Sequence, residues 1–223
     1  RGVDGGANYF FGQMLRAIYA ELPAGEEEIL ALDNAVTFCG AGHETTATTL
    51  AWAIYLLAAH PELQEEARAE AILALNGDVE TLADRLPLLR QILDETMRLY
   101  PSAAQIVREA VADDDMLGVS VKKGELTFIY PWIVHRHNML WDRPNEFDHT
   151  RWTAENKAKL HRFQYIPFGA GPRICVGARF AITEALIILS RWLGARRFRL
   201  TPGLMPIAYG NVTLRPKDGM PLI

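Results

Sequence analysis

The sequence has little cysteine, no excess of basic residues and no long uninterrupted apolar segment. Its two cysteines, Cys39 and Cys175, are too few for the disulfide framework of a small secreted protein. The formal net charge of −4 argues against a nucleic-acid-binding surface, which needs clustered positive charge. No run approaches the roughly 18 apolar residues that span a bilayer, and the segment RGVDGGANYF lacks a signal-peptide pattern. These absences favour a soluble, cytoplasmic protein that has no membrane span and binds no nucleic acid.

The apolar periodicity indicates a mainly helical chain with a small sheet. The 223 residues are 49% hydrophobic and 22% charged, which is ordinary for a globular protein. Short alternating runs predict a small sheet at 106–130, and the stretch 131–176 is irregular and rich in Pro, Trp and His. A turn is predicted at Pro23 and Gly25. Helical periodicity predicts helices at 8–22, 26–59, 61–75, 86–101 and 178–195.

The segment FGAGPRICVG, residues 168–177, places one cysteine between glycines. Five of its positions fit the pattern F-x-x-G-x-R-x-C-x-G, namely Phe168, Gly171, Arg173, Cys175 and Gly177. Glycines let the backbone turn tightly around the sulfur, and the cysteine lies near the N-terminus of the helix that begins at about residue 178. Free N–H groups and the helix dipole favour a thiolate there. A lone cysteine is more often a buried structural residue, but five matched positions favour a functional one.

The segment AGHETT, residues 41–46, lies in the middle of the longest predicted helix. Three small residues, Gly40, Ala41 and Gly42, come directly before the polar residues of this segment. Their size lets a flat group approach this face of the helix. The hydroxyl of Thr45 can replace a backbone hydrogen bond and open a kink, and Glu44 can pass protons. A packing groove for another helix, with Glu44 merely exposed, is an equally open interpretation.

Glu95 and Arg98, in DETMR, are three residues apart on one predicted helix and can form an ion pair. Pairs of this kind are usually exposed and contribute little to stability. Taken alone, the spacing is a weak signal.

The three segments, in this order, resemble the cytochrome P450 family of heme-thiolate monooxygenases, from about Glu28 to the C-terminus. A fourth segment, PNEFDHTRW, is similar to the family's P-x-x-F-x-P-x-R-F segment, with His149 in place of its second Pro and Trp152 in place of its final Phe. The resemblance implies the C-terminal part of the cytochrome P450 fold. That fold is mainly α with a small β-sheet region, and it has a long central helix and a cysteine-ligand loop.

The resemblance also implies an organisation of the chain. Members of the family place about as many residues again ahead of the long helix, so we expect one partial domain over 1–223, the C-terminal half of a family member. Its expected parts are an upstream helix and turn at 1–27, an oxygen-binding helix at 28–60, the small sheet at 106–130, and the cysteine loop and following helix at 163–194.

By this resemblance the cofactor is heme b, iron protoporphyrin IX, and the sulfur of Cys175 is the axial ligand of its iron. Arg173 is expected to pair with one heme propionate and Arg108 with the other, because guanidinium groups suit carboxylates. An exposed, solvated charge at the strand end is the alternative for Arg108. The cofactor-binding loop also contains Gly169 and Gly177, and Phe168 is expected to pack against it.

Further expected roles concern oxygen and loop support. Ala41 and Gly42 would border the oxygen-binding groove, and Glu44 and Thr45 resemble the family's acid–alcohol pair, which delivers protons for oxygen activation. Three residues would form a Glu-Arg-Arg network behind the cysteine loop, namely Glu95, Arg98 and Arg151. His135 is expected to be structural.

The implied activity is insertion of one atom of dioxygen into a hydrophobic organic substrate. Electrons would come from a ferredoxin or a reductase, because the chain has no flavin or nicotinamide domain. Arg162 and Arg179 could form a basic docking patch for that donor, or could be solvated charges. Residues 103–107 are expected to line the edge of the substrate pocket.

Two other functions remain open on the sequence. The chain could be a non-catalytic half, heme-free or weakly loaded, that self-associates through an exposed core or joins the missing N-terminal half. Cys39 and His43, four residues apart on one helix face, could hold zinc in a hydrolase, but two ligands do not make a site and we do not expect it.

Overall fold

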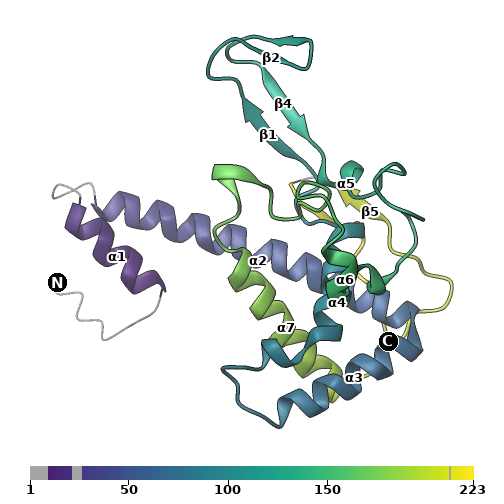
Figure 1. Ribbon diagram of the computed structural model, residues 1–223. Coiled ribbons are helices and arrows are strands. Elements are labelled where there is room, and N and C mark those ends of the chain that lie inside the picture. Colours follow the sequence, from purple (N-terminus) through teal and green to yellow (C-terminus); the bar gives the residue numbers. More distant parts are fainter. Residues whose placement is uncertain (1–9, 22–26, 211) are drawn as a thin grey trace. The chain divides into compact units, whose positions relative to one another are not determined.

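The computed structural model describes residues 10–21, 27–210 and 212–223 of the chain (Figure 1). The chain divides into two compact units, one ending at Glu44 and the other comprising Thr45–Ile223. This division falls inside the long helix α2 (Glu27–Ala59), which contributes residues to both units.

The first unit contains α1 (Phe10–Glu21) and the first half of α2. The helices predicted at 8–22 and 26–59 are therefore confirmed over the described residues. Ile18 of α1 and Ala31 of α2 are buried within this unit. The turn predicted at Pro23 and Gly25 lies outside the residues that the structure describes.

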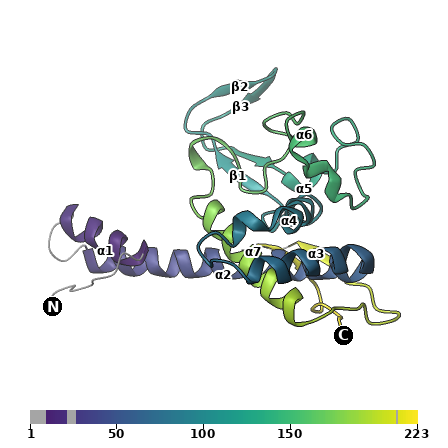
Figure 2. The ribbon, with the colours of Figure 1, turned by 60° about the horizontal axis from the view of Figure 1, so that its bottom comes forward.

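Helices form the core of the second unit (Figure 2). They are the last part of α2, α3 (Pro61–Leu75), α4 (Pro87–Leu99) and α7 (Ala178–Ala195), and they confirm the three helices predicted after Pro61. The buried face of α3 includes three alanines at a spacing of about one turn, which let α7 approach closely: Ala67, Ala71 and Ala74. A Cβ on Gly194 of α7 would lie 2.9 Å from Leu75 Cδ1, so a larger residue there would require the Leu75 side chain to shift. In the described part of the chain, no helix combines the length and the apolar character needed to cross a bilayer.

Side chains of α3 hold the ends of its two neighbouring helices. The carboxylate of Glu70 accepts the N–H groups of Leu88 and Leu89, at 2.7 and 2.9 Å, in the first turn of α4. Unpaired N–H groups and the helix dipole make a carboxylate favourable at that position. Arg68 donates to the carbonyl of Leu193 at the end of α7, where a cation is favourable for the same reason.

The small sheet expected at 106–130 is present as two separate antiparallel pairs of strands. Leu117 and Gly118 connect the outer pair with φ angles of 56° and 87°, as a tight two-residue hairpin turn requires. In Figure 1 the outer pair lies beyond the end of the inner pair. The inner pair is β1 (Ile106–Glu109) with β4 (Leu126–Ile129), and the outer pair is β2 (Asp114–Met116) with β3 (Val119–Val121).

The stretch predicted as irregular contains four one-turn helices. Apolar periodicity did not predict them, because a single turn is too short to repeat the pattern. Thr153 caps one of them by accepting the N–H of Asn156 at 3.3 Å. They are α5 (Pro131–Val134), a 3₁₀ turn at His149–Trp152, α6 (Ala154–Lys157) and a 3₁₀ turn at Gly171–Arg173.

The C-terminal segment follows α7 and forms a third strand pair, β5 (Ala208–Gly210) with β6 (Leu214–Pro216). The buried amide of Gln64 on α3 holds the start of this segment. It donates to the carbonyl of Phe198 at 2.9 Å and accepts the N–H of the same residue at 2.7 Å. This paired contact satisfies both polar atoms of a buried side chain.

Candidate functional site

The loop that precedes α7 turns back on itself before it reaches Cys175. The backbone N–H of Cys175 donates to the carbonyl of Phe168 at 2.9 Å. Gly169 and Gly171 each have a φ of +74°, which glycine adopts without strain. Gly177 has a φ of −84°, and a Cβ on it would lie 3.8 Å from the Cys175 sulfur, an ordinary contact. The loop backbone therefore requires glycine at 169 and 171, but not at 177.

Cys175 lies just before the N-terminus of α7. Gly177 occupies the N-cap position, and no side chain caps the helix. The free N–H groups of the first turn favour an anion beside them. Cys175 is exposed and takes part in no disulfide, so the interpretation of a buried structural cysteine is wrong.

Large apolar side chains next to Cys175 are in contact with solvent. Ile174, Val176 and Phe180 are 56, 79 and 70% exposed. Exposed apolar surface of this size gains free energy when another apolar group covers it. Phe168 is only partly exposed and packs against the hydrophobic core, so it anchors the loop to the rest of the second unit.

Two exposed arginines belong to the segments that meet at this loop. A Cβ on Gly169 would lie 3.6 Å from Ile106 Cδ1, so the start of β1 contacts the loop. Arg108 is two residues further along β1 and therefore lies on the same face of the strand as Ile106. Arg173 is in the 3₁₀ turn before Cys175. Within the described residues neither arginine forms an ion pair, so both guanidinium groups can bind a carboxylate.

A buried ion pair lies in α4. Arg98 donates two parallel hydrogen bonds to Glu95, from Nε to Oε2 at 2.8 Å and from Nη2 to Oε1 at 2.7 Å, and both side chains are fully buried. The interpretation of a surface ion pair is therefore wrong. Arg151 Nε lies 3.5 Å from Glu95 Oε1, so the structure brings the three residues of the predicted network together.

The pair also holds the segment before the cysteine loop through contacts that the sequence analysis missed. All five N–H groups of Arg98 have acceptors, because its remaining three donate to backbone carbonyls, those of His135, Pro144 and Glu146. Glu95 accepts Trp152 Nε1 at 2.9 Å and the backbone N–H of Asp148 at 2.9 Å. Only Trp152 carried a signal in the sequence, as an aromatic with an N–H donor where the family pattern has phenylalanine.

Two side chains near the loop are kept uncharged at neutral pH. Burial, and then the charge of Arg98, lower the pKa of His135 to about 4. Burial, and then the charge of Asp94, raise the pKa of Tyr165 well above its ordinary value. The hydroxyl of Tyr165 donates to Asp94, 3.0 Å from the backbone oxygen and 3.1 Å from Oδ1.

The predicted residues of α2 belong to both units. Ala41, Gly42 and Glu44 are exposed in the first unit, and a Cβ on Gly42 would meet no described atom within 4 Å. Thr45 is the first residue of the second unit. Its carbonyl accepts hydrogen bonds from two hydroxyls, Thr49 Oγ1 at 3.0 Å and Ser102 Oγ at 2.8 Å, which hold its backbone in place.

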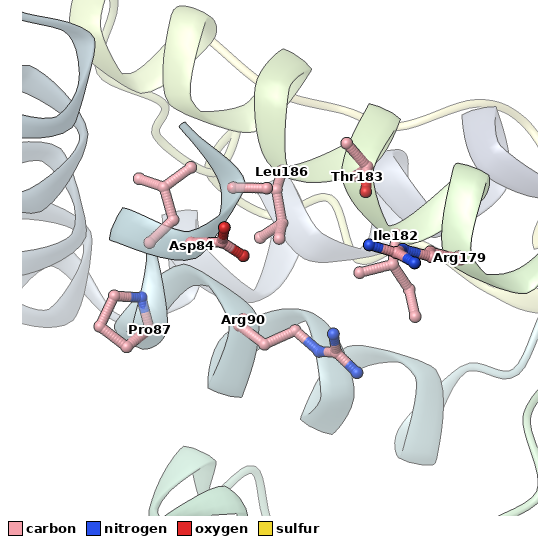
Figure 3. Close-up of a pocket in the computed structure, with 9 residues that line it drawn as sticks. Asp84, Pro87, Arg90, Arg179, Ile182, Thr183 and Leu186 are labelled. Atoms are coloured by element: carbon pink, nitrogen blue, oxygen red, sulfur yellow. The ribbon is translucent and has the colours of Figure 1, made fainter. Parts of the chain in front are cut away.

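A surface pocket of about 530 Å³ lies between the start of α4 and the start of α7 (Figure 3). Its charged lining residues come from three elements and are Asp84, Arg90 and Arg179. Cys175 does not line this pocket. Of the two arginines considered for a docking patch, Arg179 therefore lines this pocket. Arg162 instead lies over the ring of Phe163, with its Cζ 4.3 Å from the ring centroid.

Comparison with known proteins places these features in one family. The family model described as Cytochrome P450 matches residues 25–219. Cytochrome P450 714C3 of Oryza sativa subsp. japonica is 34% identical over 210 residues, which are 90% of this chain and 40% of that protein. Cyclooctat-9-en-7-ol 5-monooxygenase of Streptomyces melanosporofaciens is 35% identical over 193 residues, which are 85% of this chain and 42% of that protein.

A solved structure of the same family also resembles this chain. The crystal structure of the cytochrome P450DA heme domain superimposes with a TM-score of 0.75 and 34% identity, and the match covers 82% of this chain and 42% of that one. The expected fold, mainly α with small antiparallel sheets, is thereby confirmed as part of the cytochrome P450 fold. The chain spans about two fifths of the length of the relatives named above. Because the family model matches most of its residues, the chain belongs to the cytochrome P450 family.

Proposed function

We propose that this chain provides the cysteine-ligand part of a heme-thiolate monooxygenase, which inserts one atom of dioxygen into a hydrophobic organic substrate. The observation that carries the proposal is the exposed thiol of Cys175, presented by a tight loop at the N-terminus of α7. Family membership supports this class of reaction. The activity, the substrate and the electron donor are proposed for the complete enzyme, because the chain spans about two fifths of its relatives.

The residues around Cys175 fit heme b in three respects. The thiol is free to ligate iron, the apolar side chains beside it suit the face of a macrocycle, and Arg108 and Arg173 suit the two propionates. Gly177 lies beside the sulfur without a side chain, Gly169 turns the loop with a positive φ, and Phe168 anchors the loop. When bound, heme supplies the oxygen chemistry, and a cysteine thiolate ligand favours O–O cleavage.

The proposed proton transfer uses residues of α2. The exposed carboxylate of Glu44 would exchange protons with water, and Thr45 Oγ1 would pass them on. A positioned acid of this kind contributes roughly a hundredfold or more to a rate. The two hydroxyls on the Thr45 carbonyl support this role, because they fix the backbone that carries Oγ1. The small side chains at Ala41 and Gly42 would leave room for dioxygen.

The proposed substrate is small and hydrophobic, with residues 103–107 at the edge of its pocket. One relative is a monooxygenase whose name gives the alcohol cyclooctat-9-en-7-ol as its substrate, which supports this class of compound. The proposed electron donor is a ferredoxin or a reductase. Exposed Arg162 and Arg179 would attract acidic groups on that donor.

An absorption spectrum tests the proposal. The chain is loaded with heme, reduced and treated with carbon monoxide, and we expect the long-wavelength band that thiolate ligation produces. Cys175→Ser should abolish this band. Cys39→Ser is the matched control, because it removes the other exposed cysteine, and it should leave the band unchanged. The same band in Cys175→Ser would reject the assignment of the ligand.

A second function, self-association without catalysis, is favoured by one surface. Ile29, Leu32 and Val36 of α2 are 66, 65 and 64% exposed, and their spacing places them on one helix face. Exposed apolar stripes drive association. Light scattering measures the oligomeric state and tests this function with the variant Leu32→Glu. Leu73→Glu is the control, because Leu73 is also exposed, at 75%, but lies on α3. Oligomers that dissociate only in Leu32→Glu support it, and a monomer with one heme per chain excludes it.

A further inference from the structure

His135 is a fully buried histidine that the proposed reaction does not use. It directly follows α5, and its ring centroid lies 5.3 Å from that of Tyr165. Its backbone carbonyl accepts Nη1 of Arg98 at 2.9 Å. Its ring Nε2 accepts the backbone N–H of Ile166 at 2.9 Å. This one residue therefore receives a hydrogen bond from the buried ion pair of α4 and another from the segment that begins the cysteine loop.

The cysteine loop starts from Ile166. The carbonyl of this buried residue accepts the N–H of Gly169 at 3.0 Å. Gly169 and Gly171 then turn the chain, and the N–H of Cys175 returns to the carbonyl of Phe168 at 2.9 Å. These contacts form a continuous series from the residue that His135 holds to the residue that carries the thiol.

The contact with Ile166 requires one chemical form of the ring. Because Nε2 accepts a hydrogen bond, the ring is neutral and its proton is on Nδ1. Burial, followed by the charges of Arg98 and Arg136, lowers the pKa of His135 and favours the neutral ring. A protonated ring would direct an N–H at the N–H of Ile166 and break the contact.

We propose that His135 is a positioning residue that fixes the loop 166–175 to the Glu95–Arg98 pair. The positioning stands on the contacts above, whereas its importance for iron ligation rests on the proposed function. A side chain that merely fills space would need no acceptor at this position. Glutamine keeps an uncharged acceptor about as far along its side chain as Nε2, and phenylalanine keeps the ring and loses the acceptor.

Hydrogen exchange of the heme-free chain tests the positioning directly. We expect the Ile166 amide to exchange slowly in the wild type and in His135→Gln, and at least roughly tenfold faster in His135→Phe. His137→Phe is the matched control, because His137 is exposed and two residues away, and it should leave the Ile166 amide unchanged. Equal protection in folded His135→Phe and in the wild type would overturn the proposal.

A second measurement needs no substitution and decides the matter even where His135→Phe does not fold. Nitrogen NMR of the wild-type histidines reports which ring nitrogen carries the proton. We expect His135 to be neutral, with its proton on Nδ1 and a coupling across the hydrogen bond between Nε2 and the Ile166 amide. A proton on Nε2 would overturn the proposal.

The heme-loaded chain links the positioning to the ligand. We expect the thiolate-type carbon monoxide band to persist in His135→Gln and to be largely replaced by the band of non-thiolate heme in His135→Phe. An unchanged band in His135→Phe would contradict the link between His135 and ligation. If the wild type lacks the band, the proposed function is rejected but the positioning role of His135 is not. That role is tested separately, by hydrogen exchange of the Ile166 amide and by the tautomer of His135.

Discussion

The indole N–H of Trp152 donates a hydrogen bond to Oε2 of Glu95 at 2.9 Å, between residues 57 positions apart in the sequence. The buried carboxylate of Glu95 also accepts the backbone N–H of Asp148 and two hydrogen bonds from Arg98. A buried charge is stable only when it is paired and hydrogen-bonded, so Trp152 is part of what keeps the ion pair inside the protein.

We therefore expect Trp152→Phe to lower the free energy of unfolding by about 2 kcal/mol, because it removes one donor from a buried carboxylate while keeping an aromatic ring. Urea denaturation measures the change. Trp192→Phe is the control, because Trp192 is 41% exposed on α7. Equal losses in the two variants would show that the hydrogen bond to Glu95 contributes nothing.

The glycines of the cysteine loop should differ in their tolerance of a side chain. Gly171→Ala should cost about 1–2 kcal/mol, because a φ of +74° is strained for any residue with a Cβ even though the space around it is open. Gly177→Ala should cost less, since alanine adopts a φ of −84° without strain and only the preference for glycine at the N-cap is lost. Thermal unfolding measures both changes, and equal effects would contradict this account of the loop.

The carboxylate of Glu70 should contribute measurably to the junction of α3 and α4. Glu70→Ala removes the acceptor for two N–H groups in the first turn of α4, and we expect a loss of about 1 kcal/mol, as for other N-terminal caps. Glu66→Ala, an exposed position on the same helix, should change stability little. If both variants unfold at the same urea concentration as the wild type, Glu70 does not act as a cap.

Stability should fall in mild acid because of His135. Its pKa is lowered from 6.5 to about 4 by burial and by the charge of Arg98. Between these two values the unfolded chain binds a proton that the folded chain does not, so folding becomes less favourable as the pH falls through this range. The loss is on the order of 3 kcal/mol from pH 7 to pH 4.

Urea denaturation at several pH values measures this dependence. His135→Gln should remove it, because glutamine does not titrate, and His137→Gln at the exposed neighbour should retain it. A wild type and a His135→Gln variant with the same pH dependence would contradict the assignment to His135.

The sequence predicted the parts of the molecule whose signal is local. Pro61 marks the start of α3, because proline is favourable in the first turn. The spacing around Cys175 predicted a tight loop before a helix, and the structure has that loop. Each of these signals needs only a few neighbouring residues.

Contacts between distant segments could not be read from the sequence. His135 and Ile166 are 31 residues apart, and only folding shows that a ring nitrogen meets that backbone N–H. The burial of Glu95 and Arg98 could not be predicted from the sequence either, because exposed ion pairs have the same spacing. The division of the chain inside α2 was not predicted either, since α2 continues as one helix across Glu44.

X-ray absorption at the iron edge of the heme-loaded chain measures directly whether the sulfur of Cys175 binds heme iron. We expect one sulfur neighbour of iron in the wild type and in Cys39→Ser, and none in Cys175→Ser. Iron without a sulfur neighbour in the wild type, or with one in Cys175→Ser, would contradict this expectation.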